Sequence, residues 1–132
     1  MATDHVTGLA TRGDFEAWLR ARDTLAGVAF VSVDVVGLKR VNGERGFLAG
    51  DDLLARAAAR LRDAAHGALL VARLGGDEFV AVFRGPAEAE ATVRSLAEPA
   101  AGPRLRVAAT TGTGADTRHT LVDRLYAAVR GS

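Results

Sequence analysis

Two apolar segments joined by a turn of glycine and acidic residues constrain the fold of this chain more than any other feature. Leu69–Leu74 and Phe79–Arg84 are rich in the apolar and β-branched residues that favour strands. Between them lies Gly75-Gly76-Asp77-Glu78, which has the composition of a tight hairpin tip. The two strands of a hairpin are antiparallel, so this pattern predicts a sheet with an antiparallel part.

The rest of the chain predicts further strands and several helices. Val28–Val35 is nearly all apolar, which predicts a central strand that is covered on both faces. A short helix is expected between that strand and Gly50. Longer helices are predicted over Thr11–Leu25, Gly50–Ala65, Glu88–Ala97 and Leu121–Arg130, and a last strand over Arg104–Thr111. This order is typical of an α/β sandwich in which helices cover a mainly antiparallel sheet.

Composition excludes several classes of protein. A length of 132 residues corresponds to about one domain, and Glu98–Pro103 is too short for a linker, so residues 1–132 are predicted to form a single domain. Without cysteine and with only three scattered histidines, the chain has no disulfide and no expected zinc site. The net charge of +1 argues against binding to a nucleic-acid polymer. Because it has neither a signal peptide nor a long apolar run, we expect a cytoplasmic protein that does not bind membranes.

Three carboxylates are candidates for chemistry. Asp34 lies at the end of the predicted central strand, and Asp77 and Glu78 lie on the glycine turn. If the hairpin packs beside that strand, the three acids converge at one edge of the sheet, where they repel one another unless a cation neutralises them. Mg²⁺ suits such a place because it binds few protein carboxylates together with substrate phosphates. The alternative is ordinary turn chemistry beside a solvated acid.

The sequence around the turn resembles the signature of the GGDEF family, the diguanylate cyclase domains of bacteria. The resemblance extends to further blocks that follow one another in the order of the family and span nearly the whole chain. These blocks are Asp4–Arg12, Asp34–Asn42, Gly46–Asp51, Arg73–Phe79 and Leu125–Ala128.

This resemblance implies a palm-like fold shared with nucleotidyl cyclases. It also implies an enzyme that condenses two GTP molecules into cyclic di-GMP and releases pyrophosphate twice, with Mg²⁺ or Mn²⁺ as the cofactor. Each protomer of a homodimer is expected to hold one GTP, and the active site is shared between the two. The 3′-hydroxyl of one nucleotide then attacks the α-phosphate of the other.

The resemblance also implies roles for the acidic residues. Asp34, the backbone carbonyl of Val35, Asp77 and Glu78 are expected at the metal ions. Asp77 is in addition the candidate base for the 3′-hydroxyl, so Asp77 and Glu78 are the predicted catalytic residues.

A second group of residues is expected to bind the nucleotide. Gly75 and Gly76 are expected to wrap the phosphates, and Lys39, the only lysine of the chain, to meet a terminal phosphate. Asn42 and Asp51 are expected at the guanine edge, where a carboxylate can accept from donors that adenine lacks. Asp51 is expected in the first turn of its helix, as is Asp52.

Some residues depart from the family pattern. Val36 stands in place of a second acid and Leu38 in place of a phenylalanine. Phe47 replaces a histidine near the base pocket, where it either stacks on the base or only fills space. Val129 replaces a lysine that helps to hold phosphates, and the chain stops early at Ser132. These departures keep open a second hypothesis, a degenerate GGDEF module that binds GTP, cyclic di-GMP or a protein partner without turnover. A third is an unrelated ferredoxin-like structural domain.

Two features of regulation are expected. Many family members carry an inhibitory product site, an arginine and an acid before the signature glycines, but here His66 and Leu69 stand at those positions. We therefore expect no inhibitory product site, because leucine cannot accept hydrogen bonds and histidine lacks the fork of arginine. Self-association is expected to be transient, because no coiled-coil heptads precede the domain.

Overall fold

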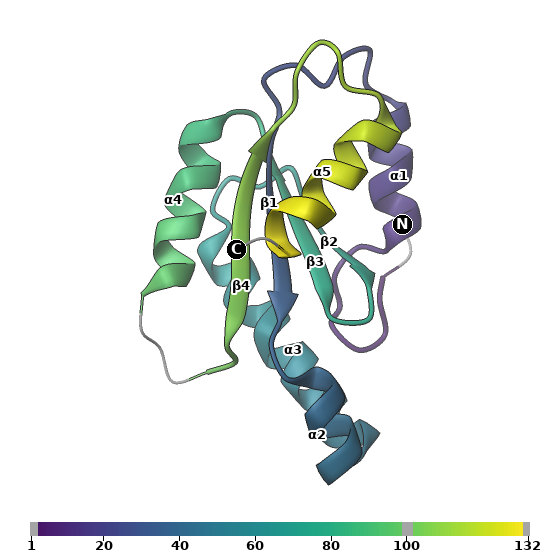
Figure 1. Ribbon diagram of the computed structural model, residues 1–132, viewed down its shortest axis with the longest axis vertical. Helices are drawn as coiled ribbons and strands as arrows, with labels where there is room; N and C mark the ends of the chain where they lie inside the picture. The colour runs from purple at the N-terminus through teal and green to yellow at the C-terminus, as the bar shows by residue number, and fades with distance from the viewer. Residues whose placement is uncertain (1–2, 99–101, 131–132) are drawn as a thin grey trace.

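Four antiparallel strands and the helices packed on them make up the described part of the protein (Figure 1). The computed structural model describes residues 3–98 and 102–130. Within these ranges the helices are α1 (Arg12–Arg20), α2 (Leu38–Arg45), α3 (Phe47–Ala64), α4 (Pro86–Ala97) and α5 (Arg118–Arg130). The strands are β1 (Ala29–Val35), β2 (Leu70–Gly75), β3 (Glu78–Phe83) and β4 (Leu105–Thr111), in the spatial order β2-β3-β1-β4. The predicted fold class, a mixed fold with an antiparallel sheet, is confirmed.

Strand β1 lies in the middle of the sheet and is covered on both faces, as predicted. It pairs antiparallel with β3 on one side and with β4 on the other. Its side chains alternate between two hydrophobic clusters. Val31, Val33 and Val35 pack on the face that carries α3 and α4, and Phe30 packs on the face that carries α1 and α5. The hairpin β2–β3 completes the sheet beside β1, which is the arrangement that brings the acidic turn to the end of β1.

The helix boundaries differ from the predicted ones. Helix α1 begins at Arg12, where a capping box between Thr11 and Asp14 fixes its start, and it ends at Arg20 rather than at Leu25. Helix α3 begins at Phe47, directly after Gly46, whose φ of 89° turns the chain between α2 and α3. Because of this earlier start the first turn of α3 holds no acidic residue, so the predicted placement of Asp51 and Asp52 was wrong. Helix α4 begins two residues early, at Pro86, because proline is tolerated at the first helical position.

Helices α2 and α3 project beyond the end of β1 at the bottom of Figure 1. At their junction the side chains of Phe47 and Leu48 are 77% and 86% exposed. Phe47 is therefore not part of the core, and both of its expected roles near the base pocket stay predictions. None of the helices in the described ranges has both the length and the apolar character needed to cross a membrane.

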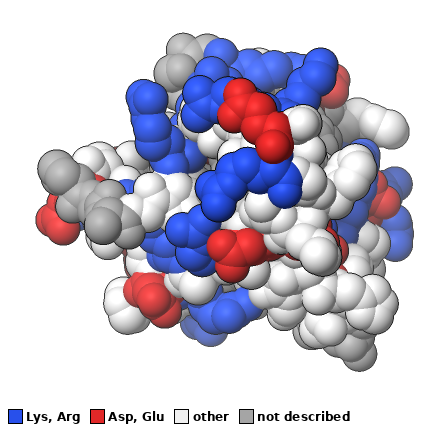
Figure 2. Space-filling view, turned by 90° about the horizontal axis from the view of Figure 1, so that it is seen from below, with Lys and Arg blue, Asp and Glu red and all other residues white. Residues whose placement is uncertain are grey.

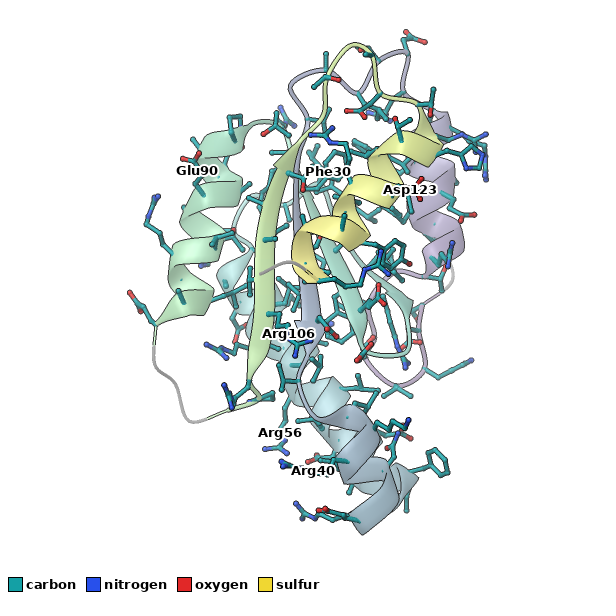
Figure 3. The ribbon with its side chains drawn as sticks, viewed as in Figure 1. Phe30, Arg40, Arg56, Glu90, Arg106 and Asp123 are labelled. Atoms are coloured by element: carbon teal, nitrogen blue, oxygen red, sulfur yellow. The ribbon has the colours of Figure 1, made fainter. Side chains whose placement is uncertain are left out.

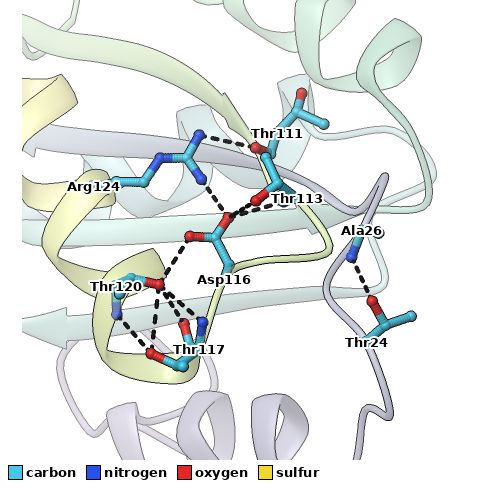
Figure 4. A network of polar contacts seen from close by, with 8 residues as sticks. All are labelled: Thr24, Ala26, Thr111, Thr113, Asp116, Thr117, Thr120 and Arg124. Atoms are coloured by element: carbon cyan, nitrogen blue, oxygen red, sulfur yellow. Dashed lines mark hydrogen bonds and ion pairs between the residues drawn. The ribbon is translucent and has the colours of Figure 1, made fainter.

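The connection from β4 to α5 lies at the opposite end of the sheet and is held by Asp116 (Figure 4). The Asp116 carboxylate accepts the backbone N–H of Thr113 at 2.9 Å and the hydroxyl of Thr120 at 2.9 Å. It also pairs with Arg124, which donates to the Thr111 carbonyl at 3.0 Å. These contacts hold the pKa of Asp116 below its ordinary value, and the hydrogen bond from the Thr113 backbone N–H has the largest effect. This network sets the start of α5 and has no acid in common with the site described below.

Candidate active site

The three predicted acids gather where β1 ends. In the register of the sheet Asp34 is the partner of Glu78 on β3. The N–H of Val35 donates to the backbone carbonyl of Asp77 at 2.9 Å, which closes the end of β1 onto the hairpin turn. Two main-chain pairings between the end of β1 and the start of β3 therefore place Asp34, Asp77 and Glu78 together.

The charges of these acids interact. Burial, a hydrogen bond with Asp77 and the charge of Asp77 raise the pKa of Asp34 to about 6, against the opposing effect of Arg106. Burial and the charge of Asp77 also raise the pKa of Glu78, while Arg130 and Arg12 oppose this rise. The site therefore favours a bound proton or a cation between its carboxylates.

The donor set suits a hard cation that shares its coordination with a substrate. Within residues 3–98 and 102–130 no group of three or more histidine or acidic side chains has the spacing of a complete metal centre. Mg²⁺ needs only one or two carboxylates when phosphates and water supply the remaining ligands. Asp34 and Asp77 meet this requirement, and Val35 lies next to Asp34 at the last position of β1.

The hairpin tip is short and open. Gly75 pairs with Glu78, so Gly76 and Asp77 form a two-residue turn. The φ of Gly76 is +34°, which lies in the region that favours glycine, and no atom lies within 4 Å of a Cβ built on either Gly75 or Gly76. A phosphate could approach the backbone here without meeting a side chain.

Arg73 fastens this tip to the start of the chain. Its guanidinium donates to the Gly76 carbonyl at 3.1 and 2.8 Å. It also donates to both oxygens of Asp4, at 3.1 and 3.2 Å. Burial raises the pKa of Asp4, but the hydrogen bonds from Thr7 and Arg73 outweigh it and hold that pKa below its ordinary value. Neither Arg73 nor Asp4 was predicted to have a role, although both lie in the motif blocks.

The N-terminus of α2 follows Asp34 closely. Helix α2 starts after Gly37, whose φ is 88°, and no described side chain caps its first N–H groups. Such an uncapped terminus favours an anion. Lys39 is exposed in the first turn of α2, where it can reach an anion bound at that terminus.

Asn42 and Asp51 lie on the packed helices α2 and α3. The Asn42 amide packs directly against Gly50 of α3, so closely that a Cβ at Gly50 would overlap with Oδ1 and Cγ of Asn42. Asp51 is the next residue and is exposed. Phe47 lies four positions before Asp51, on the same side of α3. The structure thus places the two predicted guanine ligands on packed, neighbouring helices, with an exposed aromatic ring one helical turn before Asp51.

The end of α5 shows what the departure at position 129 changes. Val129 is buried and lines a small cavity of about 10 Å³ together with Ser32, Glu78 and Tyr126. The guanidinium of Arg130 lies over the Tyr126 ring, 5.7 Å from its centroid. An apolar side chain therefore lies beside Glu78 at this point of α5, and Ser132 falls outside the described residues.

The two residues at the inhibitory-site positions lie away from the acids. His66 is exposed in the turn after α3, and Leu69 is 38% exposed just before β2. The expectation of no inhibitory product site stays a prediction.

One functional candidate could not be found from the sequence. In the sheet register Asp34 is the partner of Arg106 on β4, and Arg106 Nη1 lies 3.3 Å from Asp34 Oδ2. Figure 3 shows Arg106 beside the lower end of β1. Viewed from that end, the molecule exposes more basic than acidic surface (Figure 2). Only the register, which joins residues 72 positions apart, reveals this pair.

Comparison with known proteins identifies the family. The family model "Diguanylate cyclase, GGDEF domain" matches residues 1–112. The chain belongs to the GGDEF family. Among its relatives, the diguanylate cyclase TpbB of Pseudomonas aeruginosa is 35% identical over 100 residues, which are 72% of this chain and 23% of TpbB. An uncharacterized signaling protein of Caulobacter vibrioides is 39% identical over 84 residues, 60% of this chain and 10% of that protein. The GGDEF domain thus corresponds to only a small part of these relatives.

Solved structures agree with the family and the fold. A form of TpbB that comprises only the GGDEF domain has a TM-score of 0.72 at 26% identity, with 99% of this chain and 90% of that chain covered. The GGDEF domain of DgcB from Caulobacter crescentus, in complex with c-di-GMP, has a TM-score of 0.79 at 22% identity. The match covers 98% of this chain and 91% of the DgcB chain. At that identity the second likeness supports the fold alone. Helix α5 lies beyond the residues that the family model matches.

Proposed function

We propose that this GGDEF domain is a diguanylate cyclase that condenses two GTP molecules into cyclic di-GMP with release of pyrophosphate. The observation that carries the proposal is the direct interaction of Asp34 with Asp77, which raises the pKa of Asp34 to about 6. Two carboxylates held this close by main-chain pairing are costly in an empty site and favourable around a divalent cation.

In this proposal Asp34 and Asp77 hold Mg²⁺ or Mn²⁺, with help from Glu78 and the Val35 carbonyl. Such an ion, when bound, neutralises charge that develops on the α-phosphate. Gly75, Gly76 and Lys39 position the phosphates. The fold thus prepares an edge on which one nucleotide is held in a fixed orientation.

The guanine base binds on the α2–α3 pair, where the Asn42 amide accepts and donates hydrogen bonds and the Asp51 carboxylate accepts them at its polar edge. Asp77 takes the proton of the 3′-hydroxyl as the new P–O bond forms and pyrophosphate leaves. Because one edge holds one nucleotide, two protomers face each other in a transient homodimer. We propose that residues 1–132 form one such domain, since neighbours match nearly the whole chain.

A degenerate module that binds nucleotide or a protein partner without turnover is the second candidate. The burial of Val129 beside Glu78 favours it, because no cation is supplied from that position of α5. The two candidates share the nucleotide site and differ in whether product forms.

The test uses GTP with Mg²⁺ and chromatography of the products. Asp77→Asn should lower product formation about 10²-fold or more while the fold is retained, since it removes a metal ligand and the base. Asp123→Asn, the same change on the exposed face of α5, should leave the rate unchanged. A wild-type protein that binds GTP but forms no product would establish the degenerate module instead.

A further inference from the structure

Three charged side chains form a row across neighbouring strands. Asp34 on β1 is the register partner of Glu78 on β3 and of Arg106 on β4. Register partners in an antiparallel sheet point to the same face. Across the neighbouring strands β3, β1 and β4 the side chains are therefore Glu78, Asp34 and Arg106. Asp34, in the middle, is a candidate metal ligand.

The contact between Arg106 and Asp34 is one that can be exchanged. It consists of a single approach of 3.3 Å from one guanidinium nitrogen, not a two-pronged pair. The Arg106 side chain is 52% exposed and the Asp34 side chain 16% exposed, so the guanidinium keeps its contact with solvent whether or not it pairs with Asp34. Arg106 can leave Asp34 at small cost.

A nucleotide bound with a divalent cation supplies partners for both members of the pair. The cation can replace the guanidinium as the positive charge at Asp34. The phosphates offer pairs of oxygens, the geometry that a guanidinium binds best. We propose that Arg106 binds the phosphates of the nucleotide after the cation has displaced it from Asp34. This inference rests on the proposed function, because it assumes that the nucleotide binds at Asp34 and Asp77.

Other basic side chains near the acids have different positions or partners. Arg73 is held by Gly76 and Asp4, and Arg130 lies over the Tyr126 ring. Lys39 lies on α2, the element that follows β1 in the chain, and not on a strand of the sheet. Within residues 3–98 and 102–130, Arg106 on β4 is the basic residue whose side chain hydrogen-bonds to a candidate metal ligand, with Nη1 at 3.3 Å from Asp34 Oδ2. It brings from β4 a positive charge that Val129 does not bring from α5.

The test measures binding rather than turnover. Titration calorimetry with Mg²⁺ uses a GTP analogue in which a methylene group replaces the oxygen between the α- and β-phosphates. Arg106→Gln should weaken this binding about tenfold, the effect of losing charge-assisted hydrogen bonds. Arg106→Lys should recover part of the affinity, because it keeps the charge but not the fork. Arg94→Gln, an exposed arginine on α4, is the control and should bind like the wild type.

Two further measurements separate phosphate binding from a structural role. Guanosine, which has no phosphate, should bind Arg106→Gln as it binds the wild type in an NMR titration. Mn²⁺ alone, followed by electron paramagnetic resonance, should bind Arg106→Gln at least as tightly, since the guanidinium no longer competes for Asp34. Weaker binding of guanosine or of Mn²⁺ would show a structural role and overturn the proposal.

The outcomes also distinguish this inference from the function on which it rests. If wild type and Arg106→Gln bind the analogue equally well, Arg106 is not a phosphate ligand, and the cyclase proposal stands. If the wild type binds neither the analogue nor Mn²⁺, both proposals fail.

Discussion

Asp34 shows how a single residue can be costly to the fold and still suited to its site. It lies between Glu78 and Arg106 and contacts Asp77, and its pKa of about 6 is above the ordinary value of 3.8. Folding therefore favours the protonated form. Ionisation of Asp34 therefore lowers the free energy of unfolding. This loss of stability is absent at pH values below the ordinary pKa of Asp34 and complete at pH values above its raised pKa.

Because ionised Asp34 destabilises the fold, lowering the pH should stabilise the wild type. In the absence of divalent cations the wild type should become more stable relative to Asp34→Asn as the pH falls from 7 to 4.5. At pH 7 Asp34→Asn should be more stable by about 1 kcal/mol, less than the full shift implies because the carboxyl is partly solvated. Urea unfolding of both proteins across this pH range measures the difference. A constant difference between the two would contradict the assigned environment of Asp34.

The same residues show what the sequence can and cannot predict about a site. The convergence of Asp34 with the Asp77–Glu78 turn follows once the hairpin is placed beside the central strand, so the acids could be found. The pairing of Asp34 with Arg106 depends on the register of β1 with β4, which the composition of neither strand specifies. Arg73 was missed for a similar reason, because its partner Asp4 is distant in the sequence.

At the scale of elements, the packing of α2 against α3 decides where the base-binding residues lie. The Asn42 amide occupies the space that a side chain at Gly50 would need. Gly43, in contrast, is an exposed glycine of α2 with no atom within 4 Å of a Cβ built there. The two glycines form a matched pair on adjoining helices.

Gly50→Ala should displace Asn42 and weaken the binding of guanosine about tenfold, the expected cost of lost hydrogen bonds at the base edge. Gly43→Ala should leave binding unchanged and stabilise α2 slightly, since alanine favours the helix. NMR titration with guanosine and thermal unfolding measure the two effects. Equal guanosine affinity in Gly50→Ala and the wild type would show that Asn42 does not bind the base.

Element boundaries were harder to predict than element types. The strand and hairpin segments were found because apolar β-branched runs and a glycine turn are local signals. The start of α3 was misplaced at Gly50, because the chain changes direction at Gly46 through a φ of 89°. Glycine permits this φ, but the presence of a glycine does not by itself show that the chain adopts it. The end of α1 was misplaced because Leu25, although outside the helix, is buried in the same cluster as Phe15 and Leu19.

At the scale of the whole molecule, the arrangement of surfaces predicts how activity depends on concentration. Among the described residues the exposed large apolar side chains are Phe47, Leu48 and Leu69. A stable homodimer buries about 800 Å² on each partner, with a largely apolar centre. So small an apolar surface favours weak association.

Specific activity should therefore rise with protein concentration, because two nucleotide-loaded protomers must meet for the reaction to occur. Rates of product formation over a wide range of protein concentrations, together with sedimentation velocity, measure this dependence. Constant specific activity in a preparation that sediments as a dimer would contradict it.

The hydrogen bond from the Val35 N–H to the Asp77 carbonyl has a consequence for how such domains can change over time. It spaces the two acids through the peptide backbone, so no particular side chain is needed to keep them apart or together. Substitutions that abolish catalysis can then accumulate while the backbone around the acids keeps its conformation. A lineage descended from a chain of this kind could lose catalysis and retain a receptor for the same nucleotide.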